Sequence, residues 1–222
     1  NSGITIKNNI VVDAREGVNI NGDSDSSKTP FDWKIQNNII GSTIDSNKPE
    51  VGIIISNAKN YEISNNTISG ILKSTSTTKK AAAGITILGQ CTGNIYNNTI
   101  TDVNNTNYNN GSNTAGIFIN TSSTSITTIY NNIISNIYTP ANDNSNDNLN
   151  YKGHGIYLKT GGTTKLYYNT IVMNSTKVGS QYGKASCLYI EDASSVDLKN
   201  NILYNNLQSG TQYTLLYFIA LS

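Results

Sequence analysis

The chain has 222 residues, of which 13% are charged, and its 15 basic and 14 acidic residues give a formal net charge of +1. A chain this close to neutral, with no basic cluster beyond Lys79 and Lys80, is not expected to bind nucleic acid, and no run approaches the roughly 18 apolar residues that span a bilayer. Its 36 asparagines suggest low-complexity disorder, but isoleucine and tyrosine recur at regular positions, which indicates a folded chain.

Two adjacent asparagines between apolar residues form a motif that occurs seven times, once with tyrosine in place of the first asparagine. The second asparagines of successive copies are separated by 29, 28, 32, 34, 37 and 32 residues. A nearly constant period of this length is typical of a repeat architecture. In chain order the copies are ITIKNNI (4–10), WKIQNNI (33–39), YEISNNTI (61–68), NIYNNTI (94–100), TIYNNI (128–133), KLYYNTI (165–171) and DLKNNI (197–202).

A second motif alternates with the first and consists of a small residue followed by alternating apolar residues. Its copies begin at Gly17, Gly52, Gly84, Gly116, Gly155 and Cys187. Within one unit, alternation with a period of two predicts three short strands, at residues 85–87, 95–97 and 99–100. No hairpin turn lies between these strands, so we expect the chain to wind as a coil whose turns stack about 4.8 Å apart. Seven copies predict about seven coils and a rod on the order of 34 Å long.

The combined pattern GI-x-I followed by I-x-N-N-x-I resembles the right-handed parallel β-helix family, the fold of pectate lyases, polygalacturonases and many bacterial surface proteins. The segment LYYNTIVMNSTKVG (166–179) and the later LKNNI (198–202) are also similar to repeats of very large secreted surface proteins of Bacteroidetes-type bacteria. The resemblance implies an all-β, right-handed parallel β-helix over residues 1–222. It also implies a location outside the cell or on its surface. Because the sequence begins at Asn1 within the repeat and ends on YTLLYFIALS without a stop, we expect it to be a single segment of a longer chain.

The second asparagine of the motif is present in all seven copies, whereas Tyr168 replaces the first in one of them. Asparagine tolerates the left-handed backbone that a tight corner requires. We therefore expect the second asparagine to sit at a corner of the coil and to stack into a ladder, with side chains bonded to one another or to neighbouring backbone. An unpaired buried amide would cost roughly 1–3 kcal/mol, so such a ladder stabilises the fold only as a complete column.

The segment Gly-His-Gly-Ile around His154 resembles a motif of polygalacturonases, where the histidine belongs to a site built on carboxylates of neighbouring coils. The equivalent positions of the two preceding coils, which include Ala115 and Phe118, supply no carboxylate here. The remaining catalytic candidates are Lys159, Glu191 and Asp192, which could meet near one corner together with Lys184. The simpler interpretation of this group is surface charge pairing. Inverting glycoside hydrolysis needs two carboxyl groups, and lyase chemistry needs a base together with a cation. No complete catalytic set is therefore expected.

Three aromatic residues occupy the middle position of successive glycine-led strands: Phe118, Tyr157 and Tyr189. If the residues beside them point inward, these three point outward, one above another at the strand spacing. Such a stack is a platform on which sugar rings could bind. The alternative is that the long loops of the neighbouring corner cover the three rings, which would make them packing residues.

Two further features concern metals and thiols. In the loop NDNSNDN (142–148), Asp143, Ser145 and Asp147 place oxygen ligands at alternate positions, as calcium loops do, but the glycine of such loops is missing. Calcium is the only cofactor that the sequence suggests, and a flexible loop is the other interpretation. Cys91 and Cys187 fall in coils too far apart for a disulfide, so both are expected to be free thiols.

Together these features predict a non-catalytic structural or glycan-adhesive β-helix segment of a secreted or cell-surface bacterial protein. The expected partner is a polysaccharide or a cell-surface glycan. The open ends of the coil expose unpaired strand edges, which predicts end-to-end self-association. The alternative function is that of a polysaccharide lyase or glycoside hydrolase acting on an acidic polysaccharide.

Overall fold

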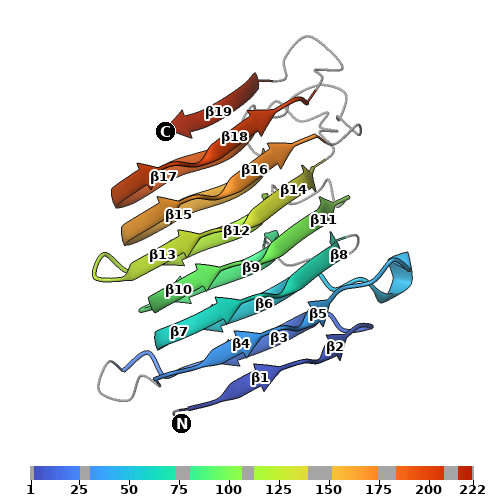
Figure 1. Ribbon diagram of the computed structural model, residues 1–222, viewed down its shortest axis with the longest axis vertical. Helices are drawn as coiled ribbons and strands as arrows, with labels where there is room; N and C mark the ends of the chain where they lie inside the picture. Colours follow the sequence, from blue (N-terminus) through green and yellow to red (C-terminus); the bar gives the residue numbers. More distant parts are fainter. Residues whose placement is uncertain are drawn as a thin grey trace.

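The computed structural model describes residues 3–25, 31–73, 81–106, 113–139, 152–174, 184–207 and 215–221. These residues form a parallel β-solenoid, because each strand pairs in parallel with the equivalent strand of the next coil. The N-terminal strands lie at one end of the stack and the C-terminal strands at the other (Figure 1). No helix within these ranges is long and apolar enough to cross a membrane.

Each coil has three strand positions. The first holds the glycine-led strands β3 (Glu16–Asn21), β6 (Val51–Ser56), β9 (Ala82–Gly89) and β12 (Thr114–Thr121). The second holds β1 (Thr5–Lys7), β4 (Lys34–Gln36), β7 (Lys59–Ser64), β10 (Thr92–Tyr96) and β13 (Ile126–Tyr130). The third holds β2 (Ile10–Val11), β5 (Ile39–Ile40), β8 (Thr67–Lys73), β11 (Thr99–Asn105), β14 (Ile133–Tyr138), β16 (Thr170–Met173) and β18 (Ile202–Asn205).

The later coils join their first two positions into one long strand. β15 (Lys152–Tyr167) and β17 (Lys184–Lys199) each run through both positions, and β19 (Leu215–Leu221) pairs with β17. Because β15 pairs with β12 and also with β13, the first and second positions form one 12-stranded sheet, while the third position forms a 7-stranded sheet. The short 3-10 helix η1 (Asp45–Asn47) lies between β5 and β6.

The expected all-β stack of short parallel strands is confirmed, with a slightly lower number of complete coils than the seven expected. Within the described residues, the first motif (4–10) supplies β1 and β2.

The interior of the solenoid is filled by apolar columns that run along its axis. Alternation along each strand points every second side chain inward, and the parallel register places like residues above one another. One such column consists of Ile53, Ile85, Ile117, Ile156 and Leu188, all at most 1% exposed. The other two strand positions contribute further columns, among them Ile63, Ile95 and Ile129, and Ile68, Ile100 and Ile134. No single coil could bury these residues alone.

The two asparagines of each motif have different roles, which corrects part of the prediction. The left-handed backbone belongs to the first residue of the pair and not to the second. Its φ lies between 54° and 59° in all seven copies, at Asn8, Asn37, Asn65, Asn97, Asn131, Tyr168 and Asn200. These residues turn the corner and are exposed to solvent. A non-glycine residue rarely adopts this conformation, and asparagine is the side chain that does so most easily.

The second asparagine forms the predicted ladder. In the middle of the column, the Asn98 side-chain oxygen accepts hydrogen bonds from the backbone N–H of Asn66 at 3.0 Å and from Asn66 Nδ2 at 3.0 Å. Asn98 Nδ2 donates to the side-chain oxygen of Asn132 at 3.0 Å and to the backbone oxygen of Ile63 at 2.9 Å. The same bonds link Asn9, Asn38, Asn66, Asn98, Asn132, Asn169 and Asn201. Five of these residues are at most 1% exposed, so their polar groups depend on this pairing.

Tyr168 is the one position where an aromatic side chain takes the left-handed corner, with φ of 56° and 60% of its surface exposed. A side chain with a Cβ costs about 1–2 kcal/mol in this conformation, and asparagine costs less. We expect Tyr168→Asn to raise the thermal midpoint of unfolding, with a stabilisation of about 1 kcal/mol. Tyr204→Asn is the matched control, since Tyr204 is also exposed but lies within strand β18. A lower midpoint for Tyr168→Asn would contradict the assignment of strain to this corner.

Both cysteines are free, as expected, and both are buried. The Cys91 thiol lies 3.2 Å from the backbone oxygen of Leu88, and the Cys187 thiol lies 3.8 Å from that of Ile171. Burial raises the pKa of Cys91 and raises the pKa of Cys187 to about 11. The thiolate is the reactive form of cysteine, so neither side chain is activated as a nucleophile.

Candidate functional site

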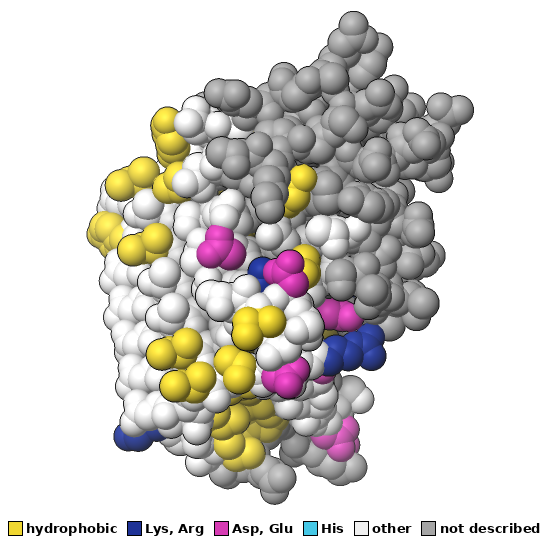
Figure 2. All heavy atoms as spheres, turned by 90° about the vertical axis from the view of Figure 1, so that its right-hand side faces the viewer, with side chains coloured by type: hydrophobic (Ala, Val, Ile, Leu, Met, Phe, Trp, Pro, Cys, Tyr) yellow, Lys and Arg dark blue, Asp and Glu magenta, His cyan; other side chains and the backbone are white. Residues whose placement is uncertain are grey.

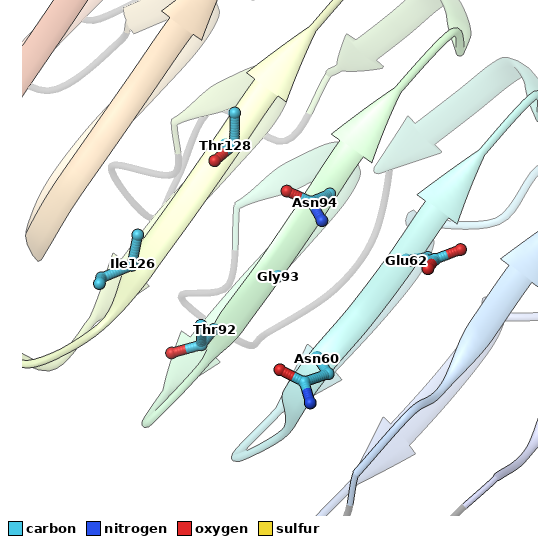
Figure 3. Close-up of a pocket in the computed structure, with 7 residues that line it drawn as sticks. All are labelled: Asn60, Glu62, Thr92, Gly93, Asn94, Ile126 and Thr128. Carbon is cyan, nitrogen blue, oxygen red and sulfur yellow. The ribbon is translucent and has the colours of Figure 1, made fainter.

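A shallow groove crosses the outward surface of β7, β10 and β13. Its volume is about 270 Å³, and it is lined by Asn60, Glu62, Thr92, Gly93, Asn94, Ile126 and Thr128. Figure 3 shows that these residues come from three neighbouring strands, so the groove runs along the solenoid axis and not along one strand. The register between β7 and β10 shifts beside Gly93, where Thr92 pairs with Lys59 but Gly93 pairs with Tyr61. This irregularity leaves Asn60 as an extra residue at the edge of the groove.

Three polar side chains form the middle column of the groove. Asn94 is in register with Glu62 on one side and with Thr128 on the other. The Glu62 carboxylate accepts a hydrogen bond from Gln36 Nε2 at 3.3 Å, and Lys34 Nζ lies 3.8 Å from it. The Glu62 side chain is 31% exposed, so it is only partly covered by its neighbours.

A pair of tyrosines stands beside this middle column. Tyr96 and Tyr130 follow Asn94 and Thr128 by two residues and therefore point to the same side of the sheet. Their rings are stacked, with centroids 4.8 Å apart and planes 3° from parallel, and both are partly exposed. Burial raises the pKa of Tyr130, and electrostatic repulsion from Tyr96 in its ionised form and from the Glu62 carboxylate adds to this effect. The Tyr130 hydroxyl is therefore protonated at neutral pH and can donate a hydrogen bond.

The tyrosine column continues into the next coils. Tyr167 is in register with Tyr130, and its hydroxyl donates to Asp197 at 2.6 Å. Lys199 Nζ lies 5.5 Å from the centre of the Tyr167 ring and 2.8 Å from Asp197. The hydrogen bond to Asp197 raises the pKa of Tyr167, and the hydrogen bond from Lys199 lowers that of Asp197. The aromatic surface therefore continues to Tyr167, where the neighbouring charges of Asp197 and Lys199 are paired with each other.

The sequence contains a signal for this column that we did not use. In three successive motifs the residue directly before the asparagine pair, or before Tyr168, is a tyrosine, as in NIYNNTI, TIYNNI and KLYYNTI. A residue one position after an inward isoleucine or leucine points outward. The outward aromatics predicted on the glycine-led strands therefore do not include Tyr96, Tyr130 and Tyr167, which lie on the second strand position.

The aromatic stack that was predicted, Phe118, Tyr157 and Tyr189, is in register across β12, β15 and β17. The ring centroids of Phe118 and Tyr157 are 5.1 Å apart, and those of Tyr157 and Tyr189 are 5.0 Å apart. Tyr157 is only 2% exposed and Tyr189 only 5%, and both pack with Ala115. Burial is the main cause that raises the pKa of Tyr157. The Tyr157 hydroxyl also donates a hydrogen bond to the Glu191 carboxylate. In this arrangement the two tyrosines offer no ring face to a sugar.

His154 is packed into the same cluster. It is 1% exposed, its Nδ1 lies 2.8 Å from Ser186 Oγ, and its ring is stacked on Tyr189 with centroids 4.7 Å apart. Of the other catalytic candidates, Lys159 and Asp192 are exposed, while the exposed Glu191 accepts a hydrogen bond from Tyr157. A catalytic group must touch its substrate, and a polymer has no access to a histidine buried to this extent.

No group of three or more His, Cys, Asp or Glu residues that could hold a metal ion occurs in the part of the chain that the structure describes. The calcium candidates Asp143, Ser145 and Asp147 lie outside that part.

The third strand position presents a different outward surface. Its first outward column contains Ile10, Ile39, Thr67, Thr99, Ile133, Thr170 and Ile202 in register. No residue of this isoleucine–threonine column is charged, and its four isoleucines are between 51% and 72% exposed. In Figure 2, hydrophobic side chains lie among uncharged polar ones toward the left of the view, while acidic and basic side chains lie nearer its centre and right. This column is thus the main alternative surface for a partner, and Tyr204 at 51% exposure lies beside it on β18.

A second hollow of about 260 Å³ lies at the N-terminal end, where it is lined by residues before β3 and around η1. Its charges largely neutralise one another. Lys48 Nζ lies 2.7 Å from Asp45, and Arg15 Nε lies 3.7 Å from Glu50. Asp13 also lines the hollow, so among its described lining residues three acidic and two basic side chains leave it with a small net negative charge, and ion pairs at the surface contribute little to stability.

No family model matches the chain, and no curated protein matches it either. What its surfaces bind must therefore be inferred from their own geometry.

Proposed function

We propose that this chain is a non-catalytic, rigid segment of a secreted or cell-surface protein that adheres to a polysaccharide or cell-surface glycan. The binding surface is the tyrosine face, which we define as the groove across β7, β10 and β13 together with Tyr96 and Tyr130. The observation that carries the proposal is the position of this tyrosine pair directly beside a shallow polar groove.

The groups on the tyrosine face suit a sugar. Sugar hydroxyls both donate and accept hydrogen bonds, and the groove offers the amides Asn60 and Asn94, the hydroxyl of Thr128 and the carboxylate of Glu62. Aromatic rings bind the apolar C–H surface of a sugar, and a tyrosine hydroxyl adds a polar edge. All these side chains project from paired strands, so little ordering is required on binding, which favours affinity.

The composition of the groove also supports binding without turnover. Of the lining residues that the structure describes, Glu62 is the only carboxylate, and none is a lysine, arginine or histidine. Glycoside hydrolysis uses two carboxyl groups, and lyase chemistry uses a base together with a cation on the acid group. The groove provides neither set.

A glycan array tests this proposal. We expect the wild-type protein to bind a subset of glycans and Tyr96→Ala/Tyr130→Ala to lose at least about tenfold in affinity, since two ring contacts worth roughly 1 kcal/mol each are removed. Tyr204→Ala is the matched control, because it removes an exposed tyrosine from the isoleucine–threonine side. Equal binding by wild type and the double variant would contradict the proposed binding site. Shortening of a bound polymer over time would show that the protein is an enzyme.

A further inference from the structure

The charge and the register of the tyrosine face narrow the class of glycan. We infer that its ligand is a neutral, extended polysaccharide that lies along the solenoid axis with about one sugar unit per coil. This inference rests on the proposed function and specifies the ligand of the same site.

The first step concerns charge. Among the described residues that line the groove, Glu62 is the only charged one, and its side chain is partly exposed. A uronate placed there would bring a second carboxylate close to the first, and like charges at short range repel. A neutral sugar has hydroxyl groups that donate to a carboxylate, and such charge-assisted hydrogen bonds are stronger than neutral ones.

The lysines of the same outward column do not reverse this preference. Lys34, Glu62, Asn94, Thr128, Lys165 and Asp197 are in register along the second strand position. Lys34 lies 3.8 Å from Glu62, and Lys165 is close enough to Asp197 to help lower the pKa of that carboxyl group. Each lysine therefore has a carboxylate beside it, so neither adds excess positive charge for an acidic polymer. Lys34 offsets part of the Glu62 charge, so the repulsion of a uronate is that of a partly paired carboxylate.

The second step concerns direction. The three middle-column residues of the groove lie on consecutive coils, about 4.8 Å apart. An extended chain of pyranose rings repeats at a length close to this spacing, so successive sugars meet Glu62, Asn94 and Thr128 in turn. Tyr96 and Tyr130, in register with each other, form one side of this path. A polymer running across the axis would leave the groove after a single coil.

The third step concerns length. The groove spans three coils, and the aromatic column extends to Tyr167 in the next one. Affinity should therefore rise with the number of sugars up to about three or four units and then level off. A site that holds only a chain end or a single sugar would show no such dependence.

Titration calorimetry with defined oligosaccharides tests the inference. We compare neutral gluco-oligosaccharides and N-acetylglucosamine oligosaccharides of two to six units with oligogalacturonates of the same lengths. Wild type should bind at least one neutral series at least tenfold more tightly than the acidic one. Glu62→Gln, which keeps the shape of the side chain, should reduce this preference severalfold. Asp192→Asn, which removes an exposed charge outside the groove, should leave it unchanged.

The outcomes separate this inference from the proposed function. If the acidic oligomers bind as tightly as the neutral ones and Tyr96→Ala/Tyr130→Ala abolishes that binding, the tyrosine face binds glycan but the inference about its class is wrong. An unchanged preference in Glu62→Gln would likewise contradict the role of this carboxylate. If neither series binds, the proposed function fails together with the inference.

Discussion

Asn98→Ala should lower the free energy of unfolding by about 3 kcal/mol. The substitution removes the side-chain oxygen that accepts both the backbone N–H and the Nδ2 group of Asn66. It also removes the donor to the backbone oxygen of Ile63 and leaves a small cavity beside Asn132. Asn66 is 1% exposed, so water does not easily replace the lost partner. A buried group left unsatisfied costs about 1–3 kcal/mol, and more than one group is affected here.

Urea unfolding and amide hydrogen exchange together measure this effect. Exchange at the Asn66 amide should accelerate strongly in the variant, because that N–H loses its acceptor. Asn97→Ala is the matched control, since Asn97 is the neighbouring corner residue, is exposed and has a φ of 55°. It should cost only about 1 kcal/mol through backbone strain. Equal destabilisation by the two substitutions would mean that the ladder contributes nothing beyond the corner.

Gly116→Ala should destabilise the solenoid by about 3 kcal/mol or more, through overpacking and not through a lost hydrogen bond. A Cβ added at Gly116 would lie 2.4 Å from Ile134 Cγ2 and 2.6 Å from the backbone oxygen of Gly155. The first atom belongs to the packed core and the second to the adjacent coil, so neither can move without disturbing its own column. Gly84 stands at the equivalent position one coil earlier, where an added Cβ would lie 2.7 Å from the Gly116 oxygen.

Thermal and urea unfolding of Gly116→Ala against Gly153→Ala tests this explanation. A Cβ at Gly153 would meet its nearest atom at 3.5 Å, an ordinary contact, so this control should remain within about 1 kcal/mol of wild type. If both variants unfold at the same urea concentration as the wild-type protein, the coils are not as closely spaced at the glycine column as the structure indicates.

The repeat architecture could be predicted from the sequence because one position per coil is strongly constrained. The buried ladder needs an amide in every coil, and Asn98 and its equivalents supply it without exception. Which asparagine of each pair turns the corner and which joins the ladder was harder to predict, because a left-handed corner and a buried amide both favour the same residue type. Tyr168 is the informative case, since it shows which of the two positions tolerates a side chain with no amide.

The site was less predictable than the fold. Alternation correctly predicts that Tyr157 and Tyr189 stand in register on a strand, but whether such a ring is exposed depends on what packs over it, which no local pattern records. The groove arises from the register shift beside Gly93 and from short side chains on three coils. These features emerge only when strands from distant parts of the chain are stacked.

Hydroxyl-radical footprinting of the protein with a bound neutral oligosaccharide tests the proposed tyrosine face most directly. Tyr96 and Tyr130 are partly exposed, so both should be oxidised in the free protein and protected in the complex. Tyr204, on the isoleucine–threonine side, should be oxidised equally in both states. Protection of Tyr204 with no change at Tyr96 and Tyr130 would contradict the account and would place the ligand on the other surface.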